Sequence, residues 1–103
     1  MTVKDLMDIM RVTVPNIYRG HAPIGAETPY MVYDVAHPNF GADNKVLAVI
    51  SSVTAQLYLS KPDTTITDAL EDSLSNNDVF WTSEEADDPS NGVYSVVYEM
   101  EVI

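Results

Sequence analysis

Cysteine is absent from the sequence, so the chain can form no disulfide bond and offers no thiol nucleophile or thiolate metal ligand. Only 4 glycines are present, and none stands in the glycine-rich pattern of a phosphate-binding loop. Basic residues are few: 5 Lys and Arg stand against 16 Asp and Glu, which gives a formal charge of -11. Such a chain repels phosphate groups, so the composition argues against a protein that grips nucleic acid or anionic lipid.

Long apolar runs and targeting signals are lacking too. Asp5 and Asp8 interrupt the apolar residues near the N-terminus, where a signal peptide needs an unbroken apolar stretch. No stretch approaches the roughly 18 consecutive apolar residues that a membrane-spanning helix requires. We therefore expect a protein that is soluble as made and has no membrane partner.

The residues that could carry catalysis are few and scattered. His21 and His37 are the candidates for acid–base chemistry, but each lies beside a proline, and neither is part of a pattern that would orient it. The sequence contains no G-x-S-x-G or S-x-x-K motif. We expect no enzyme activity, no catalytic residue, no cofactor and no metal site.

One acidic run invites a second interpretation. Glu84, Glu85, Asp87 and Asp88 could supply oxygen ligands to Ca²⁺ or Mg²⁺, but they lack the alternating order of a dedicated calcium loop. We favour a charged contact surface or a solvated hairpin tip, and this loop is also a candidate to line a passage through an assembly.

Periodicity predicts two helices. In the first, apolar residues at helical spacing follow Thr2 and Asp5, a pair that can cap a helix start, and Pro15 marks its end. The second follows Pro62, with Thr65 as its expected cap and Asn76 and Asn77 as its end, where asparagine tolerates the left-handed conformation.

The rest of the chain predicts strands and turns. The expected strands are 16–19, 30–36, 46–60, 79–83 and 93–103, and the connections include an irregular loop at 20–29, a turn at 38–45 and an acidic loop at 84–92. The last strand places Tyr98 and Met100 on an apolar face opposite Glu99 and Glu101. The order predicts one α+β domain, residues 1–103, with a mostly antiparallel sheet of four to five strands, two helices packed on one face and a long β-hairpin from Tyr30 to Ser60.

The long middle strand suggests an interface. Its first part, Val46 to Ile50, is apolar at every position, so a strand there needs cover on both faces, and a neighbouring subunit can supply it. Phe40 lies in a turn, where burial within its own domain is difficult, and is a candidate anchor into a partner. We treat the other aromatic residues mainly as packing residues. The candidate interface residues are Phe40, Asp43, Lys45, Val46, Leu47, Val49 and Ile50.

The segment N-I-Y-R-G-H-A-P-I-G-A-E-T-P-Y-M-V-Y, residues 16–33, resembles the opening of bacteriophage tail-completion or head–tail joining proteins, which are tail-terminator-like proteins of long-tailed phages. The resemblance extends through the middle strand, the second helix and the terminal strand. It implies a homo-oligomeric ring, usually a hexamer, in the virion, with assembly in the host cytoplasm. The implied partners are portal or connector proteins and tail-tube proteins, with DNA passing through the ring without being gripped.

A different class of function stays open at this stage. The acidic chain could be a binding module, such as an inhibitor or an immunity protein, that neutralises a basic partner. That hypothesis predicts a heterodimer whose association slows steeply with salt, whereas apolar contacts between strands persist in salt.

Overall fold

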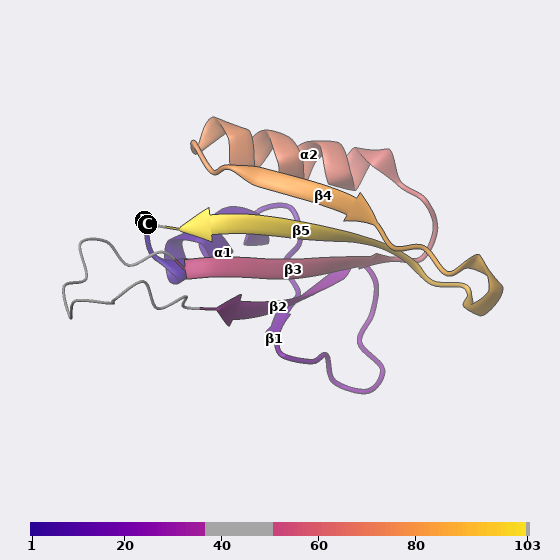
Figure 1. The fold of residues 1–103 in the computed structure, drawn as a ribbon. Helices are drawn as coiled ribbons and strands as arrows, with labels where there is room; N and C mark the ends of the chain where they lie inside the picture. Colours follow the sequence, from indigo (N-terminus) through magenta and orange to yellow (C-terminus); the bar gives the residue numbers. More distant parts are fainter. Residues whose placement is uncertain (37–50, 103) are drawn as a thin grey trace.

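The structure, a computed structural model, describes residues 1–36 and 51–102 (Figure 1). In chain order the elements are α1 (Val3–Arg11), β1 (Ile17–Arg19), β2 (Tyr30–Ala36), β3 (Ser51–Leu59), α2 (Thr64–Asn76), β4 (Trp81–Glu85), the 3₁₀ turn η1 (Pro89–Asn91) and β5 (Tyr94–Val102). The fold is α+β, as the sequence predicts.

The five strands form one sheet in the order β1-β2-β3-β5-β4. The pairs β2–β3, β3–β5 and β5–β4 are antiparallel, so the predicted mostly antiparallel sheet is confirmed. The pair β1–β2 is parallel, with Ile17 opposite Met31, which the sequence analysis did not predict. The loop between these two strands returns the chain to the starting end of the sheet, so that β2 runs in the same direction as β1.

Helix α1 begins as predicted. The Asp5 backbone N–H donates to Thr2 Oγ1 at 3.1 Å, and the Thr2 backbone N–H donates to the Asp5 carboxylate at 2.9 Å. The hydrogen bond from the Thr2 backbone N–H holds the pKa of Asp5 below its ordinary value. This reciprocal capping satisfies two backbone donors that have no partner inside the helix.

Helix α2 ends where the sequence predicts, at Asn76, but its start has a different cap. The N-cap is Asp63, whose carboxylate accepts a hydrogen bond at 2.9 Å from the backbone N–H of Thr65. The predicted cap, Thr65, is therefore wrong: Thr65 donates the capping hydrogen bond and lies inside the helix. At the other end the positive backbone φ of 58° falls on Asp78, while Asn77 keeps a φ of -103°. The predicted end of the helix is thus confirmed, and only the left-handed residue differs, since aspartate also tolerates that conformation.

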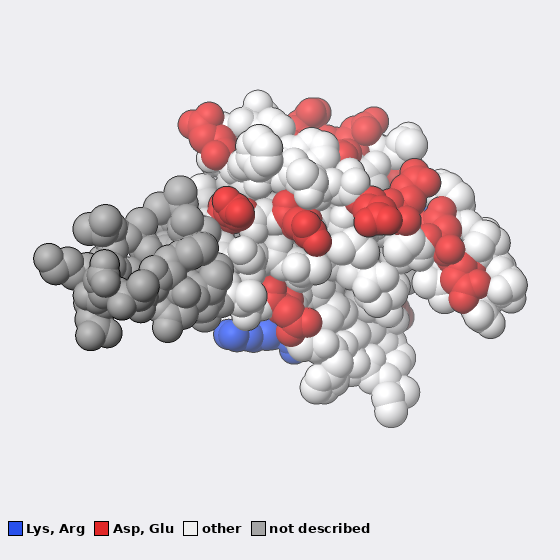
Figure 2. Space-filling view, viewed as in Figure 1, with Lys and Arg blue, Asp and Glu red and all other residues white. Residues whose placement is uncertain are grey.

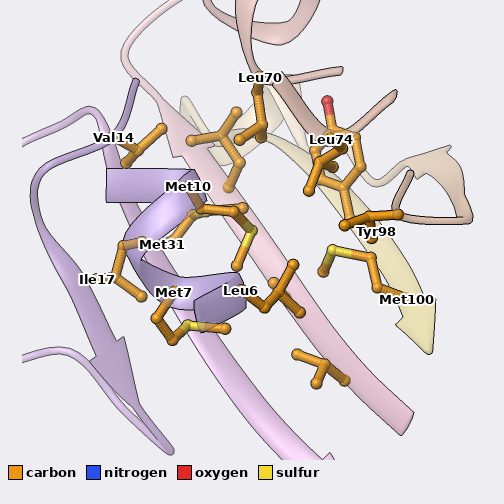
Figure 3. Close-up of a cluster of buried hydrophobic side chains, with 14 of the residues drawn as sticks. Leu6, Met7, Met10, Val14, Ile17, Met31, Leu70, Leu74, Tyr98 and Met100 are labelled. Carbon is orange, nitrogen blue, oxygen red and sulfur yellow. The ribbon is translucent and has the colours of Figure 1, made fainter. Parts of the chain in front are cut away.

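Both helices pack on one face of the sheet (Figure 3). Alternate residues of β3 and β5 point to that face, so that Val53 pairs with Met100 and Ala55 with Tyr98. Among the described residues, the buried hydrophobic side chains are Leu6, Met7, Met10, Val14, Ile17, Met31, Val53, Ala55, Leu57, Leu59, Leu70, Leu74, Val79, Tyr98, Met100 and Val102. The predicted alternation of the last strand is thus confirmed, with Glu99 and Glu101 exposed on the opposite face.

The fourth strand is shifted by two residues from its predicted position. Glu84 and Glu85 lie in β4 and not in the loop, because β5 continues far enough to pair with them, through Val97 and Val96 respectively. Acidic residues have low β propensity, and here the cross-strand partner decides the conformation. The connection from β4 to β5 is correspondingly shorter than predicted.

The predicted hairpin from Tyr30 to Ser60 is described only in part. Strands β2 and β3 pair from Tyr30–Tyr58 to Ala36–Ser52, in agreement with the prediction. Residues 37–50 lie outside the described residues, and with them all the candidate interface residues from Phe40 to Ile50.

One prediction concerns the acidic surface of α2. Burial raises the pKa of Glu71, and the neighbouring Asp68 and Asp72 raise it further. The folded protein therefore holds this proton more tightly than the unfolded chain, so stability falls as the pH rises through the folded-state pKa of Glu71. We expect Glu71→Gln to increase the free energy of unfolding at pH 7 by about 0.3–0.5 kcal/mol, from relief of like-charge repulsion.

Urea unfolding at pH 7 and at pH 4 measures this effect. The increase in the free energy of unfolding caused by Glu71→Gln is expected to be smaller at pH 4, where the raised pKa leaves the Glu71 carboxyl group of the unmodified protein largely protonated. Glu27→Gln, in the exposed loop before β2, is the matched control and is expected to leave stability unchanged at both values. A gain of equal size at both pH values would contradict the electrostatic explanation.

Candidate interaction surface

The second face of the sheet carries no helix among the described residues. In Figure 1, α1 lies behind the strands, and the face turned to the viewer is bare. We call it the open face. By the strand registers it carries Tyr18, Tyr30, Val32, Asp34, Ala36, Ser52, Thr54, Gln56, Tyr58, Thr82, Glu84, Ser95, Val97, Glu99 and Glu101. One end of the open face is rich in tyrosine, and the other end is acidic.

One end of the open face is aromatic. Tyr30 stacks on Tyr58 with ring centroids 4.9 Å apart, and Tyr18 meets the edge of Tyr30 at 6.3 Å. These three side chains, the tyrosine row, cross β1, β2 and β3 and are partly buried. Burial raises the pKa of Tyr58, with a further contribution from Tyr30, so the Tyr58 phenol stays neutral at physiological pH. The row packs adjacent strands together and leaves aromatic surface in contact with solvent.

The other end is an acid-lined groove along β4 and β5. A hollow of about 350 Å³ is lined by Ser52, Val53, Thr54, Phe80, Thr82, Glu99, Met100 and Glu101. A second hollow of about 260 Å³ is lined by Thr82, Ser83, Glu84, Val97 and Glu99. Because the two hollows share Thr82 and Glu99, we treat them as one feature, the acidic groove. Figure 2 shows acidic side chains spread across this face, with Lys and Arg seen only at one edge of the view.

The predicted acidic loop is divided by the structure. Glu84 lines the acidic groove, and Glu85 is exposed on β4. Asp87 accepts a hydrogen bond at 2.9 Å from the backbone N–H of Ser95, and Asp88 accepts from the side chains of Ser90 and Asn91 at 2.7 and 2.6 Å. The hydrogen bond from Asn91, followed by that from Ser90, holds the pKa of Asp88 below its ordinary value. Asp87 and Asp88 thus order the turn between β4 and β5.

Phe80 is a surface residue that the sequence analysis treated as a packing residue. It precedes β4 and is 78% exposed, at the end of the acidic groove. Its neighbour Trp81 points to the other face, where its indole N–H donates to Ser75 Oγ at 3.0 Å and its ring meets the edge of Tyr98. Strand alternation explains the difference, since the partly buried Trp81 faces the core and its neighbour Phe80 then faces the other way.

The remaining chemical candidates do not converge. His21 is exposed in the loop after β1, and His37 lies outside the described residues. Within residues 1–36 and 51–102, no three His, Asp or Glu side chains are grouped so that they could hold a metal ion. In the same ranges, neither helix is long and apolar enough to cross a membrane.

Comparison of the chain with protein-family models and with curated proteins found no match.

Proposed function

We propose that the protein is a structural virion protein of a long-tailed bacteriophage, which forms an oligomeric ring at the head–tail junction or at the tail end. In this role it joins portal or connector proteins to tail-tube proteins, in a ring of six copies as in the family that the sequence resembles.

The observation that carries the proposal is the apolar sequence next to the central strand. Within the domain, β3 alternates between buried side chains such as Val53 and polar ones such as Thr54. Immediately before β3, the sequence Val46 to Ile50 has no polar position at all. A segment of this composition is stabilised by contacts on every side, and a second copy of the chain is the partner that the proposal assigns to it.

Other features of the surface are consistent with assembly. Ile24, in the loop from Gly20 to Pro29, is fully exposed, and we propose that this loop contacts a neighbouring virion protein. The net charge of -11 suits a passage for DNA, because an acidic wall does not bind phosphate.

Substitution of the apolar segment tests the proposal. We expect Leu47→Asp combined with Val49→Asp to convert the oligomer to monomers, because charged side chains cannot be buried between subunits without partners. Sedimentation velocity measures the distribution of species, and electron microscopy of the unmodified protein shows whether rings form.

The matched control is Thr64→Asp combined with Thr65→Asp, which adds the same charge at the exposed start of α2. Aspartate is favourable at a helix N-terminus, so this variant is expected to remain oligomeric. Equal dissociation of both variants would indicate general charge repulsion and contradict an interface at Val46 to Ile50. An unmodified protein that is monomeric and binds one basic protein in a salt-sensitive heterodimer would instead support the inhibitor or immunity-protein hypothesis.

A further inference from the structure

We infer that the acidic groove on the open face binds an extended, arginine-rich segment of a partner protein. This site differs from the apolar segment on which ring formation depends. All the described residues that line it belong to β3, β4, β5 and the residue before β4 of one chain. The inference therefore holds for the monomer as well as for a ring.

The first argument is charge. Glu84, Glu99 and Glu101 line the groove, and Asp34 lies on the same face, in the row of Thr54 and Glu99. No position of the open face in β1 to β5 holds Lys or Arg. Among the described residues, ion pairs join Lys4 and Arg11 to Asp8 on α1, and none reaches these four carboxylates.

The negative charge of the acidic groove also decides which kind of partner can bind there. A second copy of the chain, placed face to face, would set these carboxylates against their own copies, and like charges in an interface are strongly unfavourable. Nucleic-acid phosphates and anionic lipid headgroups are repelled in the same way. A cationic protein segment is the complementary partner.

The spacing of the carboxylates indicates an extended segment. Glu99 and Glu101 are two residues apart on β5, and side chains on one face of a strand repeat about every 7 Å. Glu84 lies on the neighbouring strand β4, beside Val97, which is two residues before Glu99 on β5. A partner segment in extended conformation repeats its side chains at the same interval, so basic residues at alternate positions meet successive carboxylates.

The uncharged lining of the groove favours arginine over lysine. Phe80 presents an exposed ring at one end, and a guanidinium group can stack on such a ring while it forms hydrogen bonds with a carboxylate. The hydroxyl groups of Thr54 and Thr82 flank Glu99 on the adjacent strands and can accept further hydrogen bonds from arginine. An ammonium group offers neither the planar stacking surface nor the forked set of donors.

A nine-residue peptide in which arginine alternates with threonine is the probe. We expect titration of the full-length, isotope-labelled protein with this peptide to shift the amide resonances of β4 and β5 more than those of the helices. Glu99→Gln combined with Glu101→Gln is expected to raise the Kd by about tenfold, from loss of two paired charges. Phe80→Ala, at an exposed position, is expected to raise the Kd by about threefold.

The control is Asp68→Asn combined with Asp72→Asn, which removes the same charge from the exposed surface of α2. It is expected to change the Kd by less than about twofold, through the loss of long-range attraction alone. Circular dichroism checks that every variant is folded. Equal weakening by the groove variant and the control, or shifts that are strongest on the helices, would overturn the inference. Loss of ring formation in the Leu47→Asp and Val49→Asp variant leaves this test unaffected.

Discussion

Leu70→Ala is expected to lower the free energy of unfolding by about 2–5 kcal/mol, a large part of the stability of a small domain. Leu70 is fully buried, and it and Leu74 are the buried residues of α2. Figure 3 shows both side chains within the cluster of buried hydrophobic side chains that also contains Tyr98. Since α2 rests on these two side chains, removal of one leaves a cavity at the contact between helix and sheet.

Urea unfolding followed by tryptophan fluorescence measures the loss. Trp81 is the only tryptophan of the chain, and its indole N–H bonds to Ser75 on α2, so its emission reports the docking of α2 against β4. Ile24→Ala is the control, because Ile24 is fully exposed, and it is expected to change stability by less than about 0.5 kcal/mol. A similar, small effect of both substitutions would show that α2 does not pack on the sheet as described.

Two substitutions that each remove one hydroxyl group are expected to act in opposite directions. Tyr98 is fully buried, and its hydroxyl oxygen has no hydrogen-bond partner among the described residues. Burial, with the nearby carboxylates of Glu71 and Asp68, raises its pKa, so the group stays neutral. An unpartnered buried hydroxyl is unfavourable, and Tyr98→Phe is expected to increase the free energy of unfolding by about 1 kcal/mol.

Ser95 is equally buried but fully engaged. Its hydroxyl group donates to the Ala86 carbonyl oxygen at 2.8 Å and accepts from the Gln56 side chain at 3.0 Å. Ser95→Ala leaves both partners without this contact and is expected to lower the free energy of unfolding by about 1–3 kcal/mol. Thermal unfolding of the two variants beside the unmodified protein measures the direction of each change in stability. A loss of stability in Tyr98→Phe would show that this hydroxyl has a partner after all.

Local signals allowed several elements to be predicted from the sequence. The Thr2 and Asp5 pair lies within one helical turn, and the structure confirms that it caps α1. Strand β2 was predicted with its observed bounds, Tyr30–Ala36, because Pro29 precedes a run of β-branched and aromatic residues. In these cases the residues that decide the conformation are neighbours in the sequence.

The features that were missed depend on residues that are far apart in the sequence. The parallel direction of β1 follows from its pairing with β2, and no local pattern encodes it. The low β propensity of glutamate predicts a loop at Glu84 and Glu85, but both residues pair with β5 and form part of a strand. A local preference is weaker than a complete set of cross-strand hydrogen bonds.

The same reason explains why the acidic groove could not be found as a motif. Glu84 belongs to β4 and Phe80 directly precedes it, Glu99 belongs to β5, and they line one groove only because β4 pairs with β5. The sequence did predict that Glu99 and Glu101 share the polar face of the last strand. The interface assigned to Val46 to Ile50 stays a prediction, since these residues lie outside the described residues.

The mass of the purified, unmodified protein in solution decides whether this protein acts as an assembly of its own copies. Light scattering coupled to size-exclusion chromatography, at low and at high salt, gives that mass in units of the 11.4 kDa chain. The account predicts a discrete multiple, six copies in a ring, that persists at high salt because apolar contacts hold it together. A single 11.4 kDa species at every concentration and salt level would contradict it.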